Sequence, residues 1–136
     1  MPDEASERNA FQVPYALAML ICDAVHFDPM TCTPTILGCF TSIDAPEFPA
    51  SEASMSVYDE VTDGRGRVPV TLRVVDEDDT PLAVRETELD LTDPLVVARL
   101  VFTIKSMTFP EPGEYRFQLL SGYEPLLERR ILVMQN

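Results

Sequence analysis

Short apolar runs, each followed by a turn signal, recur along this chain about every 10–15 residues. The clearest is RVPVTLRVVD, residues 67–76, in which Val70, Leu72 and Val74 share one parity and Thr71 and Arg73 the other. Alternate residues of a strand point to opposite faces, so this period of two is typical of a half-buried β-strand. The repeated rhythm predicts an all-β fold: an immunoglobulin-like antiparallel β-sandwich of about seven to eight strands with Greek-key connections.

The runs predict strands over residues 13–27, 33–43, 55–61, 67–76, 82–91, 94–109, 113–120 and 126–134, with a loop over 44–54. The run 13–27 is apolar on both parities, which predicts a central strand covered on both faces or one that reaches an interface. A helix over the same residues is the alternative interpretation. The run 82–91 is heavily charged and is expected at a sheet edge. The run 94–109 is expected to be the longest strand, with an inward parity of Val96, Ala98, Leu100, Phe102 and Ile104.

The chain has 136 residues, a common size for one domain, and shows no internal repeat. Residues 1–11 are expected to form a flexible acidic N-terminal tail, because they are polar and terminal. Residues 12–136 are expected to form a single β-sandwich domain.

The net charge of −13 is unevenly distributed, since residues 1–64 hold eleven acidic residues and only one basic residue, Arg8. Such an acidic chain is poorly suited to phosphate backbones and anionic membranes, so neither nucleic acid nor membrane is an expected partner. No apolar run approaches the ~18 residues of a membrane-spanning helix. Three cysteines, an odd number, and the lack of an apolar leader favour a reducing compartment, and we expect the cytoplasm.

The pattern Gly-x-Tyr-x-Phe over residues 113–117 is similar to the tyrosine corner of immunoglobulin-like domains. In that motif a tyrosine hydroxyl bonds back to the main chain, and a disulfide cysteine follows two residues later. Tyr115 is expected to make this bond. Phe117 occupies the cysteine position, so the core is expected to close by packing without a disulfide.

Several segments together resemble a bacterial family of unknown function, whose members are short single-domain proteins with a predicted immunoglobulin-like sandwich. The resemblance spans about residues 14–134. Its marks are ICDAV at 21–25, ILGCF at 36–40, EFPA at 47–50, VYDEVTDGRG at 57–66, LRVVDEDD at 72–79, and FPEPGEYRF with LLERRILV near the end. It implies the fold and a bacterial source, and it transfers no catalytic residue.

His26, the only histidine, lies between Asp23 and Asp28. A histidine flanked by carboxylates can act as a base or a metal ligand. In a strand, however, Asp23 lies on the face opposite to His26, and only Asp28 can share its side. An enzyme with an unfamiliar site around these three residues is therefore one alternative, and a strand-end histidine is the other.

Other clusters are candidate metal or anion sites. Cys22, Cys32 and Cys39 with His26 could hold zinc, but their spacing does not match a cysteine knuckle, so buried, inert thiols are the preferred interpretation. The weak candidates for calcium are Asp76, Asp78 and Asp79, with Asp59, Glu60 and Asp63 as a second acidic loop. The sequence DGRGR at 63–67 could hold an anion but is read as a hairpin turn.

No Walker loop, GxSxG, HExxH or dinucleotide fingerprint occurs in the sequence, so we expect no cofactor. The leading functional hypothesis is a non-enzymatic protein-interaction or self-assembling module. Self-association through the run 13–27 or an exposed sheet edge is expected. A small-ligand or calcium-binding module using the acidic loops is the alternative from another class.

Overall fold

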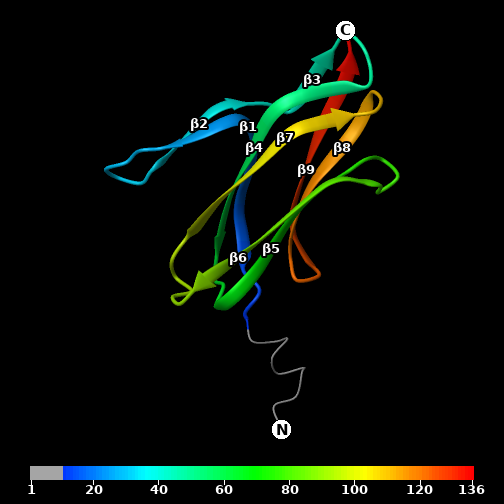
Figure 1. Cartoon of the computed structure of the whole chain (residues 1–136). Coiled ribbons are helices and arrows are strands. Elements are labelled where there is room, and N and C mark those ends of the chain that lie inside the picture. The colour runs from blue at the N-terminus through cyan, green and yellow to red at the C-terminus, as the bar shows by residue number, and fades with distance from the viewer. Residues whose placement is uncertain (1–10) are drawn as a thin grey trace.

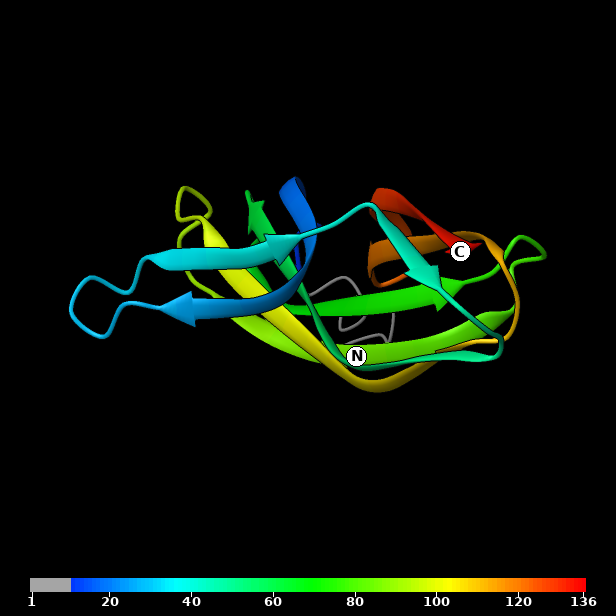
Figure 2. The ribbon, with the colours of Figure 1, turned by 90° about the horizontal axis from the view of Figure 1, so that it is seen from above.

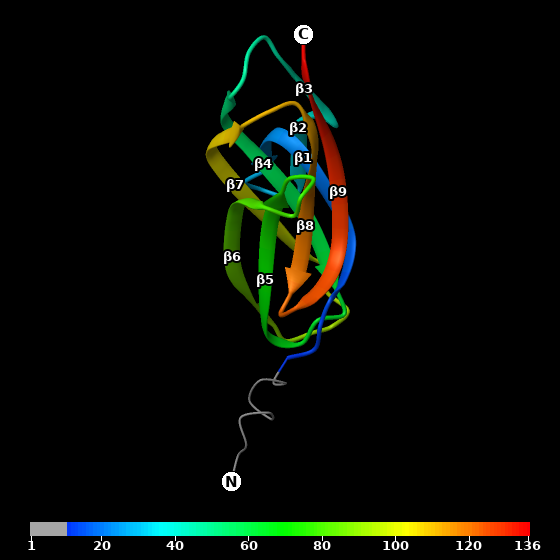
Figure 3. The same cartoon turned by 90° about the vertical axis from the view of Figure 1, so that its right-hand side faces the viewer.

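The computed structural model describes residues 11–136, which form two β-sheets packed face to face (Figures 1 and 3). Residues 1–10, and with them most of the predicted tail, lie outside the described residues. The strands are β1 (Tyr15–Phe27), β2 (Pro34–Cys39), β3 (Ser42–Ala45), β4 (Ala50–Thr62), β5 (Gly66–Val75), β6 (Pro81–Leu91), β7 (Ala98–Phe109), β8 (Gly113–Ser121) and β9 (Glu124–Gln135). The described residues contain no helix long and apolar enough to cross a membrane.

One sheet has the strand order β2-β1-β4-β7 and the other β3-β9-β8-β5-β6. Figure 3 shows β6, β5, β8 and β9 side by side in the second sheet. The predicted all-β sandwich of two packed sheets is confirmed. The count of nine described strands exceeds the expected seven to eight, and one pairing, β3 with β9, is parallel where all pairings were expected to be antiparallel.

The extra strand arises because the predicted strand 33–43 divides in two. Gly38 has a φ of +66°, and the chain leaves β2 after Cys39 and crosses to the other sheet as β3. The prediction of a loop over 44–54 was wrong in part, because β4 begins at Ala50 and pairs with β7 from Ala50 opposite Phe109 onward. This pairing depends on main-chain hydrogen bonds, which continue where the side-chain alternation is weak.

The predicted strand 94–109 begins four residues late, at Ala98. The N–H groups of Leu95 and Val96 bond to the side chain and the carbonyl of Asp93, forming a turn that delays the strand. Val96 was expected inside and is 55% exposed. The longest described strands are β1 and β4, with 13 residues each.

The predicted alternations of β5 and β8 are confirmed. Their inward residues are all buried and form the centre of the core: Val68, Val70, Leu72, Val74, Tyr115, Phe117 and Leu119. The charged strand β6 lies at the edge of its sheet, as predicted. Phe11, at the start of the described chain, already packs against the core.

The tyrosine corner is present. The Tyr115 hydroxyl donates a hydrogen bond of 2.5 Å to the main-chain oxygen of Glu111, four residues upstream. Its ring meets Phe109 edge to face, with 4.8 Å between the ring centroids. Phe117 is fully buried at the position of the missing cysteine. The turn between β7 and β8 is therefore fastened to the core by one aromatic residue.

We predict that Tyr115→Phe lowers the free energy of unfolding by about 1 kcal/mol, because the variant keeps the ring and loses only the hydrogen bond to Glu111. Chemical denaturation measures the change. Tyr123→Phe is the matched control, because Tyr123 is fully exposed and should show no change. Equal stabilities of the Tyr115 and Tyr123 variants would contradict the tyrosine corner.

Asp59 is the one polar residue that β4 points into the core. Its neighbours on the inward face are Met55, Val57 and Val61, and its register partners are Met19 and Leu100. Both carboxyl oxygens are buried and have no hydrogen-bond partner among the described residues. Burial raises the pKa of the Asp59 carboxyl to about 8. The group is therefore mostly protonated and neutral at pH 7, which limits the cost of its burial.

This raised pKa predicts a pH-dependent stability. In the unfolded chain an aspartate titrates near ~3.9. Between that pH and about 8 the folded state holds one proton more, so the free energy of unfolding falls as pH rises and then levels off. Asp59→Asn removes this effect. From pH 5 to pH 8 we expect the natural protein to lose on the order of 2–4 kcal/mol relative to the variant in urea titrations. Parallel pH profiles would contradict a neutral Asp59.

Candidate functional site

The outer faces of the two sheets differ in chemistry. On the four-stranded sheet, register places Leu20 of β1, Tyr58 of β4 and Val101 of β7 in one row across three strands. Directly opposite residues share a face, and Tyr58 alternates with the inward Val57 and Asp59, so this row lies on the outside. Outer faces of antiparallel sandwiches are normally polar, which makes an apolar row at the centre of one informative.

More apolar side chains continue this row along β1 and towards β7. Tyr15 is 58% exposed, Leu17, the extra residue of a bulge in β1, is 50% exposed, and Val97 precedes β7 with the same parity as Val101. We call this set the apolar face; it consists of Tyr15, Leu17, Leu20, Tyr58, Val97 and Val101. Leu95 and Val96, also exposed, follow the turn next to it.

Tyr58 anchors the centre of the apolar face. It is only 4% exposed, although it points away from the core. Its hydroxyl donates a 2.6 Å hydrogen bond to the Glu60 carboxylate, and Arg99 lies 3.7 Å from the same oxygen. Burial first, and then Glu60, raise the pKa of Tyr58 to about 12. The charges of Glu60 and Arg99 cancel, so this part of a strongly acidic chain is nearly neutral.

The centre of the outer face of the five-stranded sheet is polar, although Val84 on β6 and Leu132 and Met134 on β9 are also exposed on this side. Arg73, Gln118 and Glu128 are opposite one another on β5, β8 and β9 and are joined by hydrogen bonds of 2.9–3.0 Å. Arg116 and Arg130 form the next row. This face presents paired charges to solvent, as expected for a sandwich.

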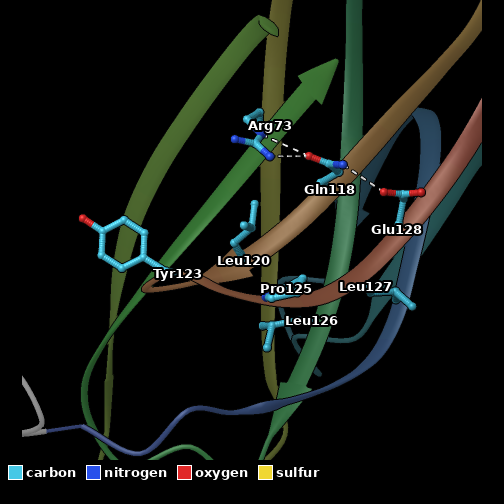
Figure 4. A pocket seen from close by; sticks show the side chains of 8 residues that line it. All are labelled: Arg73, Gln118, Leu120, Tyr123, Pro125, Leu126, Leu127 and Glu128. Atoms are coloured by element: carbon cyan, nitrogen blue, oxygen red, sulfur yellow. Dashed lines mark hydrogen bonds between the residues drawn. The ribbon is translucent and has the colours of Figure 1, made fainter. Parts of the chain in front are cut away.

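One open groove of about 450 Å³ runs along this polar face beside the β8–β9 turn (Figure 4). The hydrogen-bonded ladder of Arg73, Gln118 and Glu128 lines one end, and Leu120, Pro125 and Leu126 line the floor towards the exposed ring of Tyr123. The side-chain amide of Gln118, at the centre of the ladder, already forms hydrogen bonds with Arg73 and Glu128. We therefore take the apolar face, and not this groove, as the candidate site.

The structure does not join the three residues of the predicted histidine site. His26 is exposed near the end of β1, opposite Thr35 of β2. The Asp28 carboxylate instead accepts hydrogen bonds from the N–H groups of Met30 and Thr31 and shapes the turn after β1. Within residues 11–136, no hydrogen bond or ion pair links His26 to either aspartate. The arrangement offers no acid–base pair, and the enzyme hypothesis remains a prediction.

The calcium candidates Asp76, Asp78 and Asp79 lie in the turn between β5 and β6, as predicted. Asp76 accepts bonds from the N–H groups of Asp78 and Thr80, and Asp79 forms an ion pair with Arg116. The Asp76 and Asp79 carboxylates are thus already engaged within the protein. The prediction of a second acidic loop was wrong, because Asp59 and Glu60 lie within strand β4. Asp59 points into the core and Glu60 points to the outside.

The interpretation of the cysteines as buried thiols holds for Cys22 and is wrong for Cys32 and Cys39, which are exposed. Cys39 lies on β2, an edge strand, and Cys32 lies in the turn before it. In the described part of the chain, no group of three or more His, Cys, Asp or Glu side chains is placed to hold a metal ion.

Sequence reasoning missed the apolar face as a defined surface. The run 13–27 indicated excess apolar residues on β1, but the prediction of cover on both faces was wrong, since Tyr15 and Leu17 are exposed. The contributions of β4 and β7 could not be assigned without the register. The useful sequence signal was the second interpretation of the run 13–27, as a strand that reaches an interface.

Comparison with known proteins identifies one family and several distantly similar structures. The model of DUF6941, a family of unknown function, matches residues 17–134. No curated protein matches the chain significantly. Among solved structures, an immunoglobulin-like protein from Pseudomonas aeruginosa is similar at 16% identity and a TM-score of 0.46, with 90% of this chain and 96% of that one covered.

Two larger proteins contain a similar unit. A β-glucosidase from Listeria innocua matches at 12% identity and a TM-score of 0.48, over 91% of this chain and 16% of its own. The alkylpurine DNA glycosylase AlkC from Pseudomonas fluorescens matches at 13% identity and a TM-score of 0.44, over 85% and 30%. At these identities the likeness concerns the fold alone.

Proposed function

The chain belongs to the DUF6941 family of unknown function, and we propose that it is a non-enzymatic module that self-associates through the apolar face of its four-stranded sheet. The observation that carries this proposal is the contrast between the two outer faces. One presents an apolar row across β1, β4 and β7, and the centre of the other presents a hydrogen-bonded polar row. Burial of the first face against another surface removes apolar area from water, which favours association.

A second copy of the chain is the occupant that best suits this face. The whole chain carries a charge of −13, so two copies repel each other across most orientations. In a contact through the apolar face, the two copies meet at the region where the charges of Glu60 and Arg99 neutralise each other, so the repulsion there is small. A twofold contact is self-complementary, so the same apolar rows meet on both copies.

The apolar face also has the composition of an interface centre. Tyrosine and arginine are enriched among residues that dominate binding energy, and a polar rim around an apolar centre is typical. Tyr15 supplies an exposed aromatic ring, and Leu20 and Val101, each 36% exposed, flank the buried Tyr58. Glu60 and Arg99 supply polar groups between this row and the row of Tyr15, and Thr103 supplies one on its other side.

We predict that Leu20→Glu abolishes self-association, because it places an unpaired charge at the centre of the apolar face. Size-exclusion chromatography with light scattering over a range of protein concentrations measures the effect. Val84→Glu is the matched control: Val84 is 43% exposed, and it lies opposite Arg73 on the outside of the other sheet. It should self-associate like the natural protein.

Val101→Glu, on the neighbouring edge strand β7, is a second test of the same face, and far-ultraviolet circular dichroism checks that each variant is folded. If folded Leu20 and Val101 variants keep the natural oligomeric state, the apolar face is not the contact. If the natural protein is a monomer at every concentration, self-association itself is wrong.

A further inference from the structure

Two of the three cysteines face each other across a pair of strands. Cys22 of β1 and Cys39 of β2 are directly opposite in the register. The next pair along, Ile21 and Phe40, is hydrogen-bonded, since the Phe40 N–H donates to the Ile21 oxygen at 3.0 Å. Hydrogen-bonded and non-hydrogen-bonded pairs alternate in an antiparallel ladder. Cys22 and Cys39 are therefore a non-hydrogen-bonded pair, in which Cα atoms lie about 4.5 Å apart and side chains approach most closely.

This spacing suits a disulfide bond, which requires Cα atoms about 4.4–6.8 Å apart and side chains directed to the same side. Directly opposite residues meet that second condition. The two side chains also influence each other electrostatically, because burial and then the neighbouring Cys39 raise the pKa of the Cys22 thiol.

The residue before Cys39 supports the close approach of the two strands. Gly38 has a φ of +66°, and a Cβ atom there would collide with the carboxylate of Asp23. Glycine adopts this conformation at little cost and leaves room for the Asp23 side chain. The chain thus uses glycine to keep β1 and β2 close, one residue away from the cysteine pair.

The cysteine pair lies at the base of a two-stranded arm. Cys22 is the last residue of β1 that pairs with β4, opposite Ser56, and beyond it β1 pairs only with β2. This arm projects away from the sandwich, at the left of Figures 1 and 2. An isolated two-stranded hairpin is only marginally stable in water, so a covalent link at its base would restrain it.

We propose that Cys22 and Cys39 form a reversible cross-strand disulfide that closes the base of the β1–β2 arm. With a low-molecular-weight disulfide such as oxidised glutathione, the Cys39 thiolate attacks one sulfur, gives a mixed disulfide and releases one glutathione. The Cys22 thiolate then attacks the Cys39 sulfur, forms the protein disulfide and releases the second glutathione. Two protein thiols are oxidised, and one glutathione disulfide is reduced to two thiols.

Exposure decides the order of these steps. Cys39 is exposed and can meet the oxidant, whereas Cys22 is buried, with its sulfur 3.5 Å from the Ser56 oxygen. The buried thiol is protected from external reagents but lies next to its partner. Cys22 therefore acts as the resolving thiol, and Cys32, in the turn at the far end of the arm, takes no part.

The test is treatment of the full-length protein with oxidised glutathione, followed by thiol counting and peptide mass mapping. We expect loss of the free thiols of Cys22 and Cys39, a Cys22–Cys39 cross-linked peptide without glutathione, and full recovery of both thiols on addition of excess reduced glutathione. Cys32→Ser is the matched control and should form the same cross-link.

Variants at the pair separate the two roles. Cys22→Ala should retain glutathione on Cys39, because the resolving thiol is missing, and Cys39→Ser should leave Cys22 unmodified. The proposal is overturned if the folded natural protein keeps all three thiols, if glutathione stays on Cys39 with Cys22 present, or if the cross-link involves Cys32. Chemical denaturation of the reduced proteins confirms that each variant is folded.

Discussion

Burial of strand β4 on both of its faces is the constraint on which the rest of the structure depends. Residues 55–59 are all buried, although alternate ones point into the core and out of it. On the inner face this follows from packing against the second sheet. On the outer face, Tyr58 is covered by its neighbours Leu20 and Val101, whose own side chains then remain partly exposed. The apolar face is the consequence of covering a central strand on the side where no second sheet lies.

The same strand carries the least compensated group of the described chain, the Asp59 carboxyl. A neutral acid in the core costs less than a charged one, and the raised pKa is how the fold accommodates it. Asp59 lies in the core with both carboxyl oxygens buried, and we assign it no chemistry. Its effect is confined to the pH dependence of stability.

The strands that the sequence predicts best are those with one solvent-exposed face and one buried face. Val70, Leu72 and Val74 of β5 and the alternating residues of β8 show a clean period of two, and the structure buries them as expected. The tyrosine corner was also predictable, because its geometry depends on residues close together in the chain.

The errors in the sequence reading have a common physical origin in long-range pairing and main-chain bonds. The start of β4 at Ala50 follows from pairing with β7, and the start of β7 follows from the turn at Asp93. The division into β2 and β3 depends on where the chain can change sheets. The candidate site combines β1, β4 and β7, which are distant in sequence, so only the register could assemble it. The apolar excess of residues 13–27 indicated one of its strands.

Strand β1 connects the two surfaces that we consider functional. Its first half contributes Tyr15, Leu17 and Leu20 to the apolar face, and its second half forms one side of the projecting arm. Cys22 marks the boundary between them. Association and oxidation thus concern adjacent parts of one strand, but each depends on different side chains.

The most direct test of the central claim is sedimentation equilibrium of the natural protein at low and high salt. Two copies with a charge of −13 repel each other, and salt screens this repulsion while leaving apolar contacts in place. Self-association through the apolar face predicts a mass above the 15.2 kDa monomer that rises with concentration and with salt. A mass of 15.2 kDa under all conditions, or association that salt abolishes, would contradict it.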